Sequence, residues 1–106
     1  MNHVELLRVE QSLLLADRGV VLFPNFAAPD GWIDREEQVA LHHPDGQTVL
    51  RQGRFQLTRF QTSVPAPVEE RSRVSVLLVG PTDPVPVGTA LLCSPTLAHL
   101  LTKQRH

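Results

Sequence analysis

Cysteine, lysine and long apolar runs are scarce in this chain, and each shortage narrows what the protein can be. The single cysteine, Cys93, excludes an intramolecular disulfide and suits a reducing compartment. No apolar run approaches the roughly 20 residues that a membrane-spanning helix needs. The first residues, Met1 to Glu5, contain no basic region of the kind that begins a secretion signal. We therefore expect a cytoplasmic protein without a membrane span.

An excess of charge of either sign is also missing. The net charge is −1 and the isoelectric point is near 6.5, which predicts no general attraction to nucleic acids or membranes. Only one lysine stands beside nine arginines. The arginine excess fits either bidentate recognition of phosphate or carboxylate groups or simply the base composition of the genome.

Sequence signatures of catalysis and of metal binding are absent as well. There is no G-x-x-x-x-G-K-[ST] phosphate loop and no G-x-S-x-G nucleophile motif. His42 and His43 are neighbours on an expected strand, so they point to opposite faces and cannot share one metal ion. Cys93 has no base beside it in the sequence and is expected to be a buried apolar residue at a strand end. We expect no enzyme activity, no cofactor and no metal site.

What is present predicts an all-β domain. Nine prolines oppose long helices, and β-branched runs bounded by glycine and proline are typical of buried strands. The 106 residues are enough for one domain. Strands are expected over residues 20–23, 39–41, 48–50, 54–59, 74–79 and 87–93. Turns or loops are expected over residues 17–19, 24–31, 34–37, 44–46 and 62–71. A short helix is expected over residues 95–101, with Ser94 or Thr96 as its cap. Residues 6–15 fit either a helix, through their leucines, or an alternating strand.

Four segments in the same order and spacing resemble domain 2 of elongation factor Tu and related translational GTPases. The likeness covers about residues 6–95. It is carried by V-E-Q-S-L at 9–13 with R-G-V-V at 18–21, by G-W-I at 31–33 leading to Val39, by V-S-V-L-L-V-G at 74–80, and by V-P-V-G-T-A-L at 85–91. Glu36 stands where the family has a second glycine. The resemblance implies a closed six- or seven-stranded Greek-key barrel over residues 1–95, with residues 6–15 as its first strand. Residues 96–106 would form a short tail with helical potential.

The resemblance also implies a site. In the family, this barrel helps to hold the aminoacyl end of transfer RNA, or contacts the ribosome. The family's pocket positions fall on Glu10, Gln11, Leu13, Arg18, Phe23 and Arg73. Glu10 and Arg18 keep the residue type of the family, whereas the other four differ. Bulky Phe23 stands where the family has a small hydroxyl residue and can fill the space left open there.

A second candidate surface follows from the arginines on the strands that should be neighbours. An arginine surface beside an aromatic side chain, Phe60 or Trp32, suits RNA phosphates and bases. Its members are Arg51, Arg54, Arg59, Arg71 and Arg73. Glu69 and Glu70 lie nearby in the sequence and would neutralise part of the positive field. Trp32, next to the expected loop 24–31, fits either an interface anchor or a core position.

We expect a non-catalytic binding module, and two hypotheses describe its partner. In the first, the barrel docks the ribosome, transfer RNA or a translation-related partner, as the resemblance implies. In the second, the chain is a protein-interaction or regulatory subunit, able to form a homodimer, with no nucleic-acid role. The near-neutral charge favours a protein over RNA. A small-molecule pocket at the barrel mouth is a third hypothesis.

Overall fold

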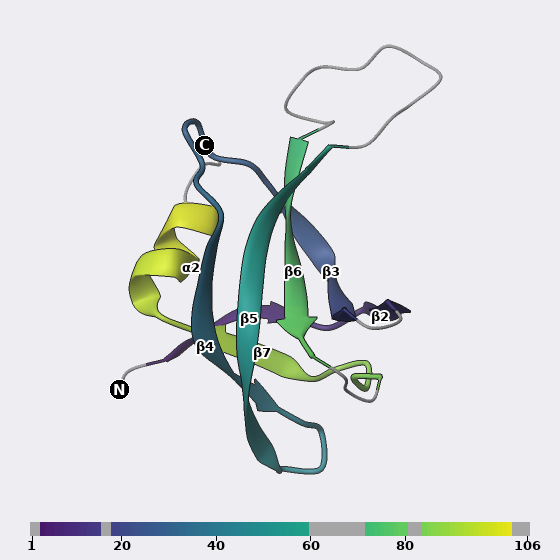
Figure 1. The fold of residues 1–106 in the computed structure, drawn as a ribbon. Coiled ribbons are helices and arrows are strands. Elements are labelled where there is room, and N and C mark those ends of the chain that lie inside the picture. The colour runs from purple at the N-terminus through teal and green to yellow at the C-terminus, as the bar shows by residue number, and fades with distance from the viewer. Residues whose placement is uncertain (1–2, 16–17, 60–71, 81–83, 103–106) are drawn as a thin grey trace.

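The computed structural model describes residues 3–15, 18–59, 72–80 and 84–102. These residues form seven strands and one helix (Figure 1). The elements are β1 (Val4–Arg8), β2 (Gln11–Leu15), β3 (Gly19–Ala27), β4 (Arg35–His42), β5 (Thr48–Arg59), β6 (Ser72–Val79), β7 (Ala90–Cys93) and α2 (Pro95–Thr102). The predicted all-β class is therefore confirmed. The expected loop at residues 62–71 lies outside the described residues.

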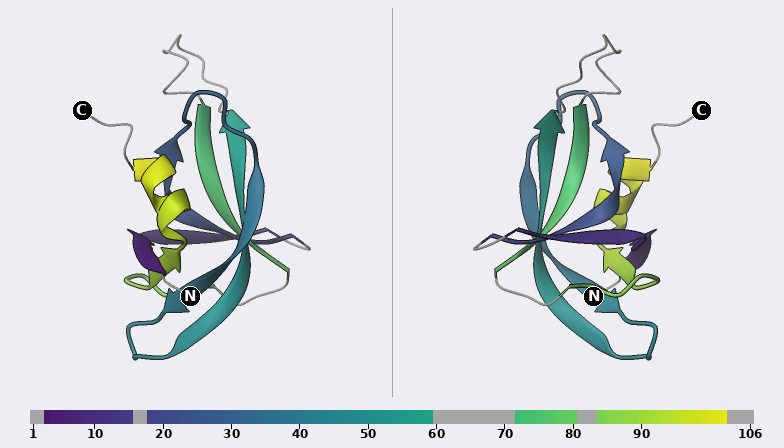
Figure 2. Two further views of the ribbon diagram at one scale, coloured as in Figure 1. Left: turned by 90° about the vertical axis from the view of Figure 1, so that its left-hand side faces the viewer. Right: turned by 90° about the vertical axis from the view of Figure 1, so that its right-hand side faces the viewer.

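All the strands belong to one curled antiparallel sheet, in the order β1-β7-β4-β5-β6-β3-β2. β1 and β2 lie at opposite ends of this order, yet only Val9 and Glu10 separate them in the chain. Val9 is hydrogen-bonded to Thr89 and Gly88 (both 2.8 Å), and Glu10 donates to the Phe23 carbonyl (2.9 Å). The two strands cross the molecule as one bent path (Figure 2). The sheet is barrel-like. The predicted extended conformation of residues 6–15 is confirmed, but these residues belong to two strands, β1 and β2, and not to the single first strand that the resemblance implies.

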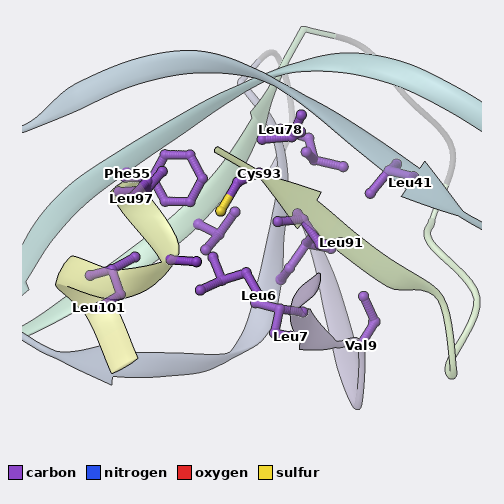
Figure 3. Packing of buried hydrophobic residues seen from close by; sticks show 14 of the residues in the cluster. Leu6, Leu7, Val9, Leu41, Phe55, Leu78, Leu91, Cys93, Leu97 and Leu101 are labelled. Atoms are coloured by element: carbon purple, nitrogen blue, oxygen red, sulfur yellow. The ribbon is translucent and has the colours of Figure 1, made fainter. Parts of the chain in front are cut away.

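The core lies inside the curl of the sheet. Alternation places Val74, Val76 and Leu78 of β6 in the core, and Ser75 and Leu77 between them are buried as well. In β1 both Leu6 and Leu7 are buried, because a bulge in the pairing with β7 turns consecutive side chains inward. Figure 3 shows these side chains meeting others from β4, β5, β7 and α2.

Helix α2 begins at a side-chain cap and packs into the same core. The Leu97 N–H donates to Ser94 Oγ (3.3 Å), which makes Ser94 the N-cap residue. Ser94 in turn donates from its backbone N–H and its hydroxyl to the Glu37 carboxylate (2.9 and 3.1 Å). Leu97 and Leu101 are buried, and the helix contacts β1 and β3. No helix within the described residues has the length and apolar character to cross a membrane.

Several strand boundaries differ from the sequence prediction. The segments expected at 48–50 and 54–59 form one continuous strand, β5, and β6 begins at Ser72 rather than at residue 74. β3 continues through Pro24 to Ala27, where a loop was expected, because the pairing with β6 shifts register between Leu22 and Phe26. A proline is tolerated at such an irregularity because its missing N–H breaks no regular ladder bond. β4 begins at Arg35, within the expected charged turn, because residues 35–37 pair with β5. β7 begins at Ala90 rather than at residue 87.

One glycine turn is confirmed, and a second, expected at residues 17–19, is described only from Arg18 onward. The turn at Pro44–Gly46 joins β4 to β5, and Gly46 has a φ of 94° with open space where a Cβ would lie. Gly19, where β3 begins, has a φ of 137°, and a Cβ there would overlap the carbonyl oxygen of Leu78. The second position thus needs glycine for two reasons, its backbone conformation and the close approach of β6.

Candidate binding surfaces

Three of the six positions implied by the family resemblance lie together. Glu10 is exposed at the bend between β1 and β2, and its N–H donates to Phe23. Gln11 is exposed and pairs with Phe23 across the β2–β3 ladder. Phe23 itself is half-buried. The structure therefore groups an acid, an amide and an aromatic ring at one end of the β2–β3 hairpin.

The other three positions lie apart from this group. Arg18 is exposed at the far end of the hairpin, roughly 13 Å away along β2. Leu13, between the two ends, is 49% exposed. The Arg73 guanidinium on β6 is half-buried and donates to the side-chain oxygen of Asn25 (2.9 Å) and to its carbonyl (3.4 Å). Arg73 thus supports the irregular part of β3.

The candidate arginine surface is divided between the two faces of the sheet. Arg54 lies on the outer face, where its guanidinium forms a 2.7 Å ion pair with Glu36. Hydrogen bonds from Arg54 and Gln52 hold the pKa of the Glu36 carboxyl below its usual value. Arg51 lies three residues earlier on β5, and so on the opposite face. The side chain of Arg59 and the residues Phe60 and Arg71 lie outside the described residues.

Trp32 lies in the loop between β3 and β4, held by a neighbouring carboxylate. Asp34 Oδ1 accepts hydrogen bonds from the Trp32 indole N–H (3.1 Å) and from the backbone N–H of Leu57 on β5 (2.8 Å). The Arg35 guanidinium lies over the indole ring, 5.9 Å from its centroid. Trp32 is half-buried against the core, whereas its neighbour Ile33 is 80% exposed. The loop therefore presents an apolar side chain on a fixed support.

A shallow hollow of about 170 Å³ extends this surface onto the helix. Its lining includes Pro29, Trp32 and Ile33 of the loop, Arg35 of β4 and Leu100 of α2. Leu100 is 39% exposed. We call these five residues the Trp32 surface.

A larger groove of about 600 Å³ lies at the opposite end of the sheet, between the β4–β5 hairpin and residues 84–86. Its apolar lining comes from Leu41, Val49 and Val85, with prolines at the edge. Arg51, His43, Asp45 and Gln47 also line it. We call it the mouth groove.

His42, His43 and Cys93 have local hydrogen-bond partners. His42 Nδ1 is 3.1 Å from Thr48 Oγ1, and His43 Nδ1 is 3.2 Å from Thr89 Oγ1. Cys93 is fully buried, and burial together with the Glu37 charge raises the pKa of its thiol to about 12. A thiol with that pKa is a poor nucleophile at neutral pH. Within the described parts of the chain, no three His, Cys, Asp or Glu side chains are grouped to hold a metal ion.

Sequence reasoning missed the exposure of Ile33 and the neighbouring Leu100 on α2. It offered a pocket at the barrel mouth as one hypothesis but did not identify the residues that line the mouth groove. One signal was available: strand alternation extended back from Phe55 places Arg51 on the inward-facing side of β5. The contribution of residues 84–86 to the groove had no local signal, because it depends on where a distant segment folds back.

Comparison of the chain with protein-family models, with curated proteins and with solved structures gives no match.

Proposed function

We propose that this chain is a non-catalytic binding module that docks another protein through the Trp32 surface. The observation that carries the proposal is Ile33, a large aliphatic side chain that is 80% exposed beside a half-buried tryptophan. Single exposed apolar residues are common. Here, however, the exposed residue adjoins an aromatic ring, a proline and a leucine from a second element around one hollow.

The support beneath Ile33 strengthens the argument. The Asp34 carboxylate connects the loop to β5 by accepting the backbone N–H of Leu57. The backbone N–H of Trp32 donates to the Pro29 carbonyl (3.2 Å). A loop that is already ordered loses little conformational entropy when it binds, so more of the contact energy remains as affinity. The residues that contribute most binding energy at protein interfaces are enriched in tryptophan and arginine. Both are present here, with the Arg35 guanidinium over the Trp32 ring.

The charges around the Trp32 surface favour a protein partner. Arg35 stands beside the acidic residues Asp30 and Asp34, so the rim has both signs of charge. An apolar centre with a mixed polar rim is typical of protein–protein interfaces. Nucleic-acid surfaces instead concentrate positive charge. A partner protein in the same reducing compartment is consistent with the single buried thiol.

A photo-crosslinking experiment tests this function. A benzophenone amino acid replaces Ile33 in the full chain, and the matched control carries it at Leu50, which is 54% exposed on β5 at the far end of the sheet. We expect discrete nuclease-resistant protein adducts from position 33, absent from position 50 and reduced by Leu100→Asp. Adducts with a second copy would identify a homodimer, which ultracentrifugation would confirm. Equal labelling from both positions, or nuclease-sensitive adducts, would contradict the proposal.

The translational form of the proposal has separate support. The barrel-like sheet and the extended conformation within residues 6–15 support it, since the resemblance to the elongation-factor domain implies both. On that reading the sheet closes as a Greek-key barrel, and the partner is the ribosome or transfer RNA. Such binding should weaken steeply with salt, by roughly one power of ten in affinity per tenfold salt for each phosphate neutralised. It should also weaken with Arg54→Ala. A flat salt series would leave only the protein partner.

A further inference from the structure

The mouth groove contains a polarity inversion on β5. In the β4–β5 ladder, Val49 is opposite Leu41 and Arg51 is opposite Val39. A Cβ on Gly53 would touch the side chains of Val39 and Phe55, so this register faces the core. Arg51 therefore occupies an inward-facing position on the ribbon formed by β4 and β5, at the end that borders the mouth groove. Its neighbour Leu50, on the outward-facing side, is 54% exposed. For stability alone, the leucine and the arginine would be the other way round.

On β4, the two charged residues of the inward-facing register have partners. Glu37 accepts two hydrogen bonds from Ser94 at the start of α2. Arg35 stacks over Trp32. Within the described residues, the one hydrogen bond from the Arg51 side chain goes to the carbonyl of its neighbour Leu50 (3.3 Å). Four of the five guanidinium donors thus have no hydrogen-bond acceptor among the described residues.

The groove around Arg51 has the size and composition of a ligand site. Its volume of about 600 Å³ lies within the range of roughly 300–1,000 Å³ that is usual for small-molecule pockets. Leu41, Val49 and Val85 provide an apolar floor. His43, on the same inward-facing register, is oriented by Thr89, whose side chain is fully buried. The polar side chains that line the groove are those of His43, Asp45, Gln47 and Arg51, a small set beside the apolar residues, as is usual for sites that select a ligand.

We infer that the mouth groove binds a small organic monocarboxylate, whose carboxylate pairs with Arg51 and whose apolar tail lies on Leu41, Val49 and Val85. Guanidinium and carboxylate match in a planar two-bond geometry. A single negative charge is favoured over a phosphate because Asp45 also lines the groove. The Asp45 carboxylate accepts the Gln47 N–H (2.9 Å), which keeps this negative charge at the turn. The site is separate from the Trp32 surface, so neither proposal depends on the other.

Titration of the ¹⁵N-labelled chain with hexanoate, followed by NMR, tests the inference. We expect saturable shifts confined to residues 41–51 and 84–89. Hexanamide, which has the same shape without the charge, should bind at least about tenfold more weakly. Arg51→Gln should weaken hexanoate binding by a similar factor. Arg51→Lys, which keeps the charge without the forked geometry, should give an intermediate loss.

The matched control is Arg54→Gln, which removes an exposed cation from the outer face of the same strand and should leave hexanoate binding unchanged. The inference is overturned if hexanoate gives no saturable shifts, if hexanamide binds equally well, or if Arg51→Gln binds as the wild type does while retaining a native spectrum. Tighter binding of phenyl phosphate than of hexanoate would overturn the assignment to monocarboxylates.

Discussion

Alkaline titration of Cys93 offers an unusually clean test of the core. The thiol is fully buried at the end of β7, and burial with the nearby Glu37 charge raises its pKa from 9.0 to about 12. In the unfolded chain the same thiol is in water and ionises near its ordinary value. The folded state therefore retains the proton over a pH range in which the unfolded state releases it.

The sign and the size of the effect follow from this difference. Below pH 9 both states hold the proton and stability is unaffected, whereas above pH 9 ionisation favours the unfolded chain. With an unfolded pKa of 9.0 and a folded pKa of about 12, the free energy of unfolding falls by about 1.4 kcal/mol between pH 8 and pH 10. This value depends mainly on the unfolded pKa, so it holds as long as the folded pKa stays above about 11.

The composition makes the measurement specific. The chain has no tyrosine and one lysine, so few other side chains titrate between pH 8 and pH 10. Urea unfolding is followed at both pH values by the fluorescence of Trp32, the single tryptophan, with reductant present. The wild type should lose about 1.4 kcal/mol more than Cys93→Ala does over the same interval. Equal losses in the two proteins would refute the buried, un-ionised thiol.

Three further predictions concern the turns and caps. Gly19→Ala should lower the free energy of unfolding by more than about 4 kcal/mol, and Gly46→Ala by about 1–2 kcal/mol. Both glycines have positive φ, but only at Gly19 would the added Cβ overlap a backbone atom, the Leu78 carbonyl oxygen. Similar urea midpoints for the two variants would contradict this prediction. Ser94→Ala should cost about 1 kcal/mol and speed amide exchange in the first turn of α2, and unchanged exchange would argue against the cap. Asp34→Ala should increase the mobility of Trp32, seen as lower fluorescence anisotropy at an unchanged overall fold, and an unaltered anisotropy would show that the loop needs no such anchor.

Local patterns predicted the strands well where an apolar, β-branched run is bounded by turn residues. Residues 74–79 are such a run and lie in β6, and Pro44–Gly46 form the turn that their residue types favour. They failed at β3, where a register shift lets a strand pass through Pro24. The candidate surfaces could be predicted only in part from the sequence. The sequence analysis identified Trp32 as a candidate. The exposure of Ile33, however, depends on the hydrogen bond from the Leu57 N–H to Asp34, which joins segments far apart in the chain.

The chain's composition and short-range patterning were sufficient to determine an all-β domain, because alternation and turn chemistry act between residues close in sequence. Only the tertiary structure decided that residues 4–15 bend to reach both ends of the sheet. It also decided that Glu37 accepts hydrogen bonds from Ser94, the N-cap of α2, and that Arg51 lines a groove beside residues 84–86. Each of these depends on a pairing between segments far apart in the chain. Such pairings are selected by the burial and hydrogen bonding of the whole sheet, which no single window of sequence contains.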